Sequence, residues 1–394
     1  MVKKIGWLLM IFSVGFMGSI RPVWAFSIEA KAAILMDPVS GKILYAQNEH
    51  QRLPPASVTK VMTMLLIMEA VESGRIGWDE KIVTSKAAAG MGGSQIYLKE
   101  GEEMTLREMF KAIAVVSAND ASTAIAEHLY GSDIDFVEAM NNRAQKLKLK
   151  NTHFANETGL PDPEHYSSAY DLAVISRELL KYPEVLKFTS IWMDSLRDGQ
   201  FTLRNTNELI RVYRGADGLK TGHTSEAKYC LAATAKKGDF RLLSVILGAE
   251  SDAARVAQTK RLLDYGFRNF QWKPVFESKK VIGRVYIKGA KQEQVPVQLR
   301  SDFGVVVERG KELVVTTRIT SSKNIKFPIK SGARIGTISA VLDGKVIGQA
   351  PVYAAENVEE ANFLVKGWRW IRDFFKSLFS KKTEKLSESF ERLY

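Results

Sequence analysis

Two pairs of strand-like segments enclose a block of helix-like segments, and this order restricts the fold more than any other feature. The first pair, AAILMD and KILYAQ, flanks the turn at 38–42, and the second pair flanks the turn at 236–239 within YCLAATAKKGDFRLLSVILGA. Apolar runs that flank Gly- or Asp-containing turns predict β-hairpins. Between and after them the sequence predicts helices from Ser57 and near 106–116, 119–130, 133–149, 169–180 and 252–266. We therefore expect an α+β domain whose antiparallel sheet is built from both ends of the segment.

The pattern changes near residue 273. Short β runs separated by turns, such as KVIGRVYIKG, QVPVQLR and FGVVVERG, continue to about residue 355. Such spacing predicts a small all-β domain, and this segment has no cluster of polar residues that a reaction would need. We expect a first domain over 26–272 and a small β-sandwich domain over 273–358.

The N-terminal segment has the features of an export signal. Lys3 and Lys4 precede the apolar run IGWLLMIFSVGFMGSI, and small residues precede position 26. This pattern predicts a secretory signal peptide over 1–25, cleaved after Ala25. The alternative is an uncleaved membrane anchor, for which the run is short. Either interpretation exports the protein, and the single cysteine, Cys230, excludes an intrachain disulfide and fits a buried apolar position.

The C-terminal segment, 359–394, predicts an amphipathic helix and a tail. On a helical wheel, the apolar side chains of 362–382 share one half, except for Val365, and the charged ones fill the other. Charges interrupt the segment too often for a spanning helix, so we expect it to lie on an anionic membrane surface. The alternative is a helix docked on its own domain. The formal net charge of +12 also suits an anionic surface, and no nucleic-acid-binding motif is present.

One candidate site is the Ser-x-x-Lys pair Ser57 and Lys60. The same pattern recurs in SEAK at 225–228, so the match is weak alone. Two prolines, however, precede Ser57 and helix-forming residues follow it, which predicts a helix N-terminus there. Unpaired backbone N–H groups at that end would stabilise an oxyanion, and Lys60 lies one turn away from the Ser57 hydroxyl. A lysine acts as a base only when neutral, so burial and a neighbouring cation must lower its pKa.

A second candidate is the SAN sequence at 117–119, which falls between two predicted helices. Ser117 is suited to relay a proton, and Asn119 to hold a substrate amide. The alternative is a helix cap, since Ser and Asn both cap helices. A similar SKN sequence at 322–324 lies in the β domain, away from the other candidates.

A third candidate is the KTGH sequence at 220–223, which we expect on an edge strand. Gly222 would let a substrate backbone lie beside the strand. Lys220 would be the cation that lowers the pKa of Lys60, and Lys220 with Thr221 would bind a carboxylate. The His223 backbone N–H would be the second oxyanion donor beside that of Ser57. The alternative is a β-turn with Gly222 at positive φ.

The three motifs, in this order, resemble those of the serine-type D-alanyl-D-alanine carboxypeptidases, the low-molecular-mass penicillin-binding proteins. The resemblance covers nearly the whole chain and includes LKNTHFANETGLPDPEHYSSAYDLA. It implies a β-lactamase/transpeptidase-like first domain, in which Ser57 is the acylated nucleophile, Lys60 its base and Ser117 the third catalytic residue. It implies these substrate-binding residues: Asn119, Lys220, Thr221, Gly222, His223 and Arg255. Ala118 departs from the glycine or aspartate usual there.

The resemblance further implies a cell-wall enzyme at the outer face of the cytoplasmic membrane. Such an enzyme removes the terminal D-alanine from peptidoglycan stem peptides that end in D-Ala-D-Ala, without cofactor or metal, and β-lactam antibiotics acylate it. Hydrolysis rather than cross-linking is implied by the resemblance alone. The histidines form no ligand cluster, which argues against a metallopeptidase: His50, His128, His153, His165 and His223.

Two alternatives stay open. A β-lactamase shares the fold, and ETGLP at 157–161 is similar to its glutamate segment, although proline stands where asparagine is expected. A non-catalytic, membrane-anchored cell-wall scaffold protein would have kept the fold and lost the reaction.

Overall fold

The computed structural model describes residues 26–310, 315–322, 325–342, 344–365 and 367–369. The first domain is built on a five-stranded antiparallel sheet in the order β2-β1-β9-β8-β7. Its strands are β1 (Ala32–Met36), β2 (Ile43–Gln47), β7 (Ala216–Thr224), β8 (Lys228–Lys237) and β9 (Phe240–Ala249). Because β1 pairs with β9, with Ile34 opposite Val245, the two ends of the segment meet in one sheet. The predicted α+β architecture is confirmed.

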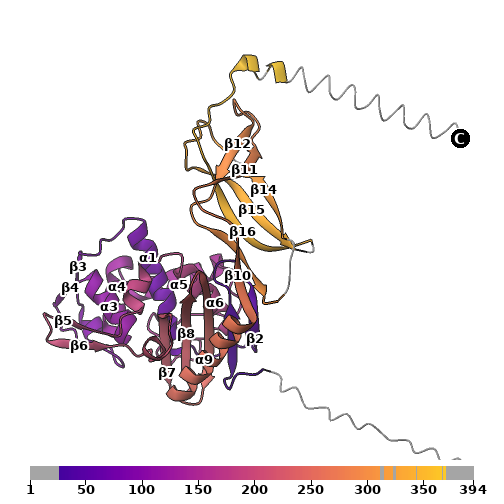
Figure 1. The fold of residues 1–394 in the computed structure, drawn as a ribbon. Helices are drawn as coiled ribbons and strands as arrows, with labels where there is room; N and C mark the ends of the chain where they lie inside the picture. The colour runs from indigo at the N-terminus through magenta and orange to yellow at the C-terminus, as the bar shows by residue number, and fades with distance from the viewer. Residues whose placement is uncertain (1–25, 311–314, 323–324, 343, 366, 370–394) are drawn as a thin grey trace, which may run out of the picture.

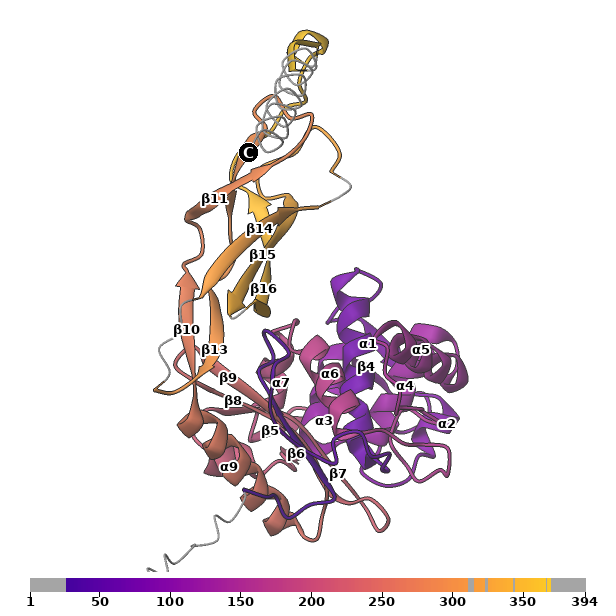
Figure 2. The ribbon, with the colours of Figure 1, turned by 90° about the vertical axis from the view of Figure 1, so that its right-hand side faces the viewer.

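The two faces of this sheet pack against different helices. Successive side chains of a strand point to opposite faces. In β1, Ile34 packs into the core shared with the large helical cluster, and Leu35 into the core shared with α9 (Asp252–Asn269). Figure 2 shows α9 on one side of the sheet and the cluster on the other. The cluster contains α1 (Lys60–Glu72), α2 (Lys86–Ala89), α3 (Leu106–Val116), α4 (Asn119–Tyr130), α5 (Asp133–Lys146), α6 (Ala169–Leu179) and α7 (Val185–Thr189). The short helix α8 (Leu209–Val212) instead packs Leu209 into the core shared with α9.

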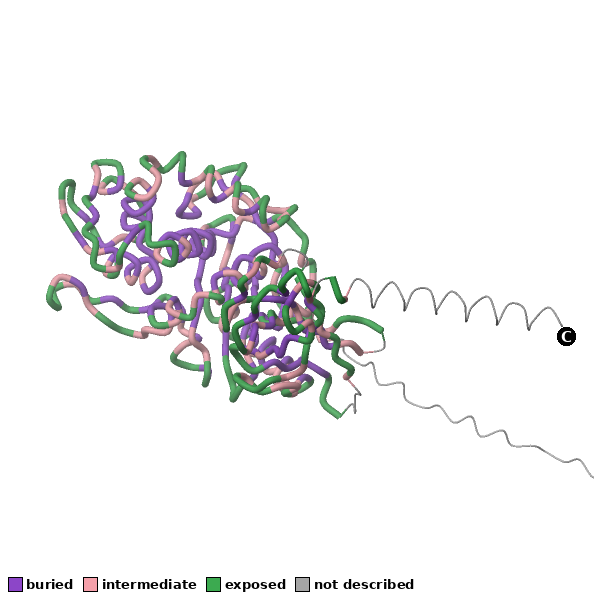
Figure 3. The backbone as a smooth tube through the Cα atoms, turned by 90° about the horizontal axis from the view of Figure 1, so that it is seen from above, coloured by how far each residue is buried: buried purple, intermediate pink, exposed green. Residues whose placement is uncertain are grey.

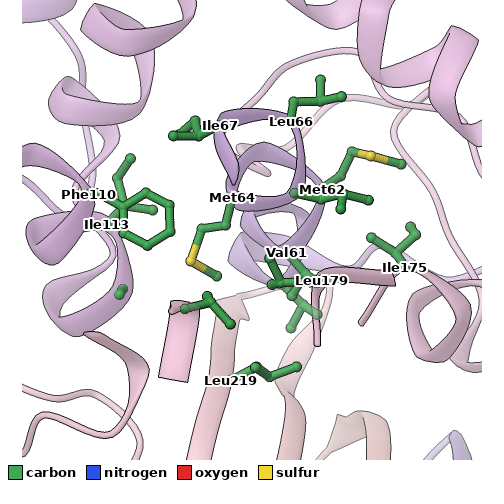
Figure 4. Packing of buried hydrophobic residues seen from close by; sticks show 14 of the residues in the cluster. Val61, Met62, Met64, Leu66, Ile67, Phe110, Ile113, Ile175, Leu179 and Leu219 are labelled. Carbon is green, nitrogen blue, oxygen red and sulfur yellow. The ribbon is translucent and has the colours of Figure 1, made fainter. Parts of the chain in front are cut away.

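Helix α1 forms the centre of the cluster. Ten of its 13 residues are buried, and apolar side chains occur all round it, as expected for a helix enclosed by others. Figure 4 shows Met64 facing Phe110 of α3, with Ile175 of α6 on another side of α1. The tube in Figure 3 shows the same division between a buried interior and an exposed rim. This enclosure places Lys60, the first residue of α1, inside the protein.

The sequence prediction differs from the structure at several places. The helix expected from Ser57 starts at Lys60, and Ser57 lies in the preceding 3₁₀ turn, η1 (Ala56–Thr59). The helix expected over 133–149 ends at Lys146, and the last helix continues to Asn269. Two short hairpins were not predicted: β3 (Lys81–Val83) with β4 (Glu103–Thr105), and β5 (Met193–Leu196) with β6 (Phe201–Arg204).

The second domain is all-β, as predicted. Its main sheet has the order β11-β12-β16-β15-β14, and β10 pairs with β13 beside it. The strands are β10 (Phe270–Phe276), β11 (Val281–Tyr286), β12 (Gln294–Gln298), β13 (Phe303–Glu308), β14 (Thr316–Ser321), β15 (Arg334–Leu342) and β16 (Lys345–Ala354). Val305 and Val307 of β13 pack in the core of this domain, whereas Val306 packs in the core next to α9. The β10–β13 pair therefore joins the two domains, and the predicted boundary at 272 and 273 falls within β10.

The C-terminal helix begins at the far end of the β domain (Figure 1). Arg369 donates hydrogen bonds to the carbonyls of Ala290 and Lys291, both at 2.7 Å. Phe363, Leu364 and Trp368 are exposed. The predicted signal peptide and most of the predicted amphipathic helix lie outside the described residues. Within the described part of the chain, no helix is long and apolar enough to cross a bilayer.

We predict that Phe110→Ala destabilises the first domain by about 3–5 kcal/mol, because it removes a ring that is completely buried between α1 and its neighbours. The Phe110 ring centroid lies 5.4 Å from that of Trp78 and 5.0 Å from that of Phe188. Urea unfolding followed by tryptophan fluorescence measures the change. Val83→Ala, at an exposed position, is the control and should change stability by less than about 0.5 kcal/mol. Equal stability of the two variants would contradict this packing.

Candidate active site

Ser57 lies where the 3₁₀ turn η1 leads into α1. The residue before it, Ala56, has a φ of 48°, a left-handed conformation that an alanine adopts only when the surroundings hold it there. The ε-amine of Lys60 lies 3.3 Å from the Ser57 hydroxyl oxygen. The predicted pairing of the two side chains is therefore present, on a backbone held by its neighbours.

Three polar atoms surround the Lys60 amine. Besides the Ser57 hydroxyl, the Asn119 side-chain oxygen lies at 2.6 Å and the Thr158 carbonyl at 2.7 Å. A neutral amine has two protons and one lone pair. Asn119 and Thr158 can accept both protons, which leaves the lone pair for the proton of Ser57. This arrangement suits a general base.

Burial changes the proton affinity of both lysines. It lowers the pKa of Lys60 to about 7, against the opposing effect of the Glu157 and Asp120 carboxylates. Burial also lowers the pKa of Lys220 well below its ordinary value, and the cations Lys60 and Arg255 lower it further. We expected Lys220 to lower the pKa of Lys60. Burial is instead the main cause there, and the repulsion between the two amines lowers the pKa of Lys220.

The SAN segment meets Lys60 from the other side. Ser117 ends α3 with a φ of 67°, and its buried hydroxyl has no hydrogen-bond partner among the described residues. Asn119 begins α4, and its side-chain nitrogen donates to the Gly92 carbonyl at 2.7 Å. Neither side chain caps α4, because its N-cap, Ala118, makes no such bond. In this structure the Asn119 amide connects Lys60 to the loop at Gly92, and Ser117 is free to bind another group.

The KTGH segment lies on β7, the edge strand of the sheet, as predicted. Gly222 is within the strand and not at positive φ, so the alternative of a β-turn is wrong. A Cβ atom at Gly222 would lie 3.0 Å from the Ser57 nitrogen and 2.7 Å from the Pro55 carbonyl oxygen. Only glycine lets the strand approach the backbone of Ser57 this closely.

A cavity of about 590 Å³ opens beside these groups. Ser57, Ser117, Thr221, Gly222, His223 and Arg255 line it together with residues that sequence reasoning missed: Ser94, Arg204, Asn205, Thr206, Glu208, Tyr229 and Asp252. Lys60, Asn119 and Lys220 are buried beneath the lining. The structure thus brings all the predicted site residues to one place. The polar run RNTNE at 204–208 is the sequence feature that could have indicated four of these missed residues: Arg204, Asn205, Thr206 and Glu208.

The missed residue Thr206 connects two predicted ones. Its hydroxyl lies 2.6 Å from that of Thr221, and its carbonyl lies 3.5 Å from an Arg255 nitrogen. Arg255 also donates to the Gly222 carbonyl at 3.4 Å and pairs with Asp252. One end of the cavity therefore has a hydroxyl and a guanidinium held side by side, which suits a carboxylate. No cluster of metal-ligating side chains occurs within the described residues.

Comparison with known proteins identifies relatives of both domains. A family model described as D-alanyl-D-alanine carboxypeptidase matches residues 20–251, and one described as penicillin-binding protein 5, C-terminal domain, matches residues 270–360. The D-alanyl-D-alanine carboxypeptidase DacF of Bacillus subtilis is 45% identical over 88% of this chain and 90% of its own length. DacA of Haemophilus influenzae is 34% identical over 90% of this chain and 91% of its own length. The crystal structure of penicillin-binding protein 5 from Haemophilus influenzae superposes with a TM-score of 0.69 at 34% identity, covering 86% of this chain and 100% of that one.

We predict that Gly222→Ala lowers the rate at which Ser57 reacts with a fluorescent penicillin by about 100-fold, because the added methyl group displaces β7 from the Ser57 backbone. The matched control is Gly77→Ala, where a Cβ atom meets nothing within 4 Å. Stopped-flow labelling of both variants measures the effect. A rate equal to that of the control would show that the strand and the turn do not need this close contact.

Proposed function

Because the chain belongs to the family of D-alanyl-D-alanine carboxypeptidases, serine hydrolases that act on peptidoglycan, we propose that Ser57, Lys60 and Ser117 perform the reaction in it. The observation that carries this assignment is the position of the Lys60 amine. It is completely buried, two acceptors hold its protons, and the Ser57 hydroxyl is the third neighbour. The proposed substrate is a stem peptide that ends in D-Ala-D-Ala.

In the first step, neutral Lys60 takes the proton of Ser57 while the Ser57 oxygen attacks the carbonyl carbon between the two D-alanines. The backbone N–H groups of Ser57 and His223 stabilise the resulting oxyanion. When the intermediate collapses, the C–N bond breaks and the terminal D-alanine leaves with a proton that the Ser117 hydroxyl passes on from Lys60. The buried hydroxyl of Ser117, which has no hydrogen-bond partner in the part of the chain that the structure describes, supports this relay role.

The terminal carboxylate of the substrate binds at the end of the cavity formed by Thr221 and Arg255. Lys220 lies beneath, with its pKa lowered by burial and by the neighbouring basic groups of Lys60 and Arg255. An incoming carboxylate would favour the charged form of Lys220. Substrate binding therefore brings a compensating anion into a site that holds three basic groups.

In the second step, water attacks the acyl-enzyme and releases the shortened peptide. A β-lactam acylates Ser57 through the same first step. Glu157, the residue that suggested a β-lactamase, is buried, bonded to the Thr123 hydroxyl and outside the cavity lining. The contact with Thr123 holds its carboxylate on the side of α4, and the relatives are carboxypeptidases, so we favour the carboxypeptidase.

The relatives are cell-wall enzymes, and we propose an extracytoplasmic location with the C-terminal helix on the membrane surface. Phe363, Leu364 and Trp368 expose their side chains at the start of that helix. Large apolar and aromatic side chains of this kind insert at the interface between lipid and water. The hydrogen bond from Arg369 to the Ala290 carbonyl supports the alternative, a helix docked on its own domain. This contact involves only the polar side of the helix.

We predict that the exported protein, purified without residues 1–25, reacts with a fluorescent penicillin and releases D-alanine from a stem pentapeptide ending in D-Ala-D-Ala. Ser57→Ala should abolish both reactions because it removes the nucleophile. Gel fluorescence and an enzymatic D-alanine assay measure them. Labelling without D-alanine release would contradict the carboxypeptidase and favour transpeptidation. Rapid penicillin turnover would favour the β-lactamase, and no labelling would favour the scaffold protein.

We also predict that a chain ending before Asn362 stays active but loses its affinity for vesicles containing anionic lipid, because the apolar side chains from Phe363 onward are removed. Co-sedimentation with vesicles measures binding, and penicillin labelling confirms that the truncated protein is folded. If the truncated protein sediments as the full chain does, another surface binds the membrane.

A further inference from the structure

Glu157 is a buried carboxylate that the proposed mechanism does not use. Only 3% of the residue is exposed, on the segment between α5 and α6. Its carboxylate accepts a hydrogen bond from the Thr123 hydroxyl of α4. Burying an ionisable side chain is costly unless its surroundings stabilise it. Groups of the protein, and not water, must therefore stabilise the buried carboxylate.

The backbone around Glu157 holds it next to the base. The Glu157 carbonyl accepts a hydrogen bond of 2.6 Å from the hydroxyl of Thr63, which lies one helical turn after Lys60. The next carbonyl, that of Thr158, accepts the bond of 2.7 Å from Lys60 itself. Thr123, which binds the carboxylate, lies one turn after Asn119 on α4. Three contacts thus fix Glu157 at the junction of the two helices that carry Lys60 and Asn119.

Three other ionisable groups interact with Lys60: Asp120, His165 and Lys220. The Asp120 carboxylate accepts hydrogen bonds from the backbone N–H groups of Ile96, Leu98 and Ala121, so it holds the neighbouring loop. His165 is neutral above pH 5, because burial lowers its pKa to about 4. Lys220 lies on β7 and interacts in turn with Arg255 of α9. Glu157 is the carboxylate near Lys60 that binds no backbone N–H group among the described residues.

We propose that Glu157 is a positioning residue that sets the basicity of Lys60 and so the pH range in which Ser57 is acylated. This role rests on the proposed function of Ser57 and Lys60. A buried anion favours the protonated form of a nearby amine, and its effect is strong where water is excluded. Glu157 therefore opposes the burial that lowers the pKa of Lys60. It keeps Lys60 a strong enough base to take the proton of Ser57.

The substitution Glu157→Gln changes the pKa of Lys60 in a defined direction. Removing the negative charge lowers the pKa of Lys60 below its value of about 7, so more of the amine is neutral in acid. The acid limb of the acylation rate should move to lower pH by about one unit. A weaker base transfers the proton less well, so the rate above pH 8 should fall by about threefold. The variant should thus be faster than the wild type in acid and slower in alkali.

The experiment measures the second-order rate of acylation by a fluorescent penicillin between pH 5 and 9. Glutamine has nearly the same shape as glutamate and keeps an acceptor for Thr123. The control is Glu164→Gln, which removes a charge from an exposed position in the same segment and should leave the profile unchanged. Glu157→Asp keeps the negative charge but places it one methylene group farther from Lys60. The acid limb of its acylation profile should therefore move to lower pH too, but less than that of Glu157→Gln. If Glu157→Gln fails to fold, Glu157→Asp alone tests the proposal.

A profile of Glu157→Gln with the wild-type midpoint, or one lowered equally at every pH, would overturn the role proposed for Glu157. If instead the wild type shows no acylation that Ser57→Ala abolishes, the proposed function fails, and the role of Glu157 fails with it. The two failures are distinguishable because the first leaves wild-type acylation intact.

Discussion

The burial of one amine, that of Lys60, is the constraint on which the rest of the site depends. An amine in water is protonated at neutral pH and cannot accept the proton of a serine. Enclosure of α1 on all sides removes water from Lys60 and lowers its pKa to about 7. The core of the first domain therefore stabilises the fold and also lowers the pKa of Lys60 into the range that the proposed role as a base requires. Hydrogen bonds from the Lys60 amine to the Thr158 carbonyl and the Asn119 side chain then orient its lone pair toward Ser57.

Close backbone contacts bring the separate motifs together. Gly222 lets β7 approach the Ser57 turn, and a Cβ atom at Gly159 would lie 2.0 Å from the Ala56 carbonyl oxygen. Ala56 and Ser117, on either side of the site, both have left-handed conformations. Such conformations are costly for residues other than glycine and persist where the surrounding structure enforces them. The geometry at Ser57 is thus imposed by elements far apart in the sequence.

This dependence on distant elements explains what the sequence could and could not predict. Local sequence patterns predicted the helices at 106–116 and 119–130, and the KTGH motif predicted the edge strand. The motifs predicted which side chains meet. The connection of Asn119 to Gly92 and of Thr206 to Thr221 joins segments that no local pattern relates, so it required the structure. The same is true of Glu157, which the sequence related only to the glutamate segment of the β-lactamases and whose backbone carbonyl binds Thr63 of α1.

The arrangement of the two domains bears on how the cavity meets its substrate. The β10–β13 pair contributes to both cores, and Lys42 of the first domain donates to the Val306 carbonyl at 3.1 Å. The contact between domains is therefore a packed one, and the β domain carries the first domain at one end. At its other end, Arg369 binds two carbonyls and pairs with Glu293 while Phe363, Leu364 and Trp368 face outward. Figure 1 shows the first domain and the start of the C-terminal helix at opposite ends of the β domain, so on the proposed membrane contact the first domain would be held away from the lipid.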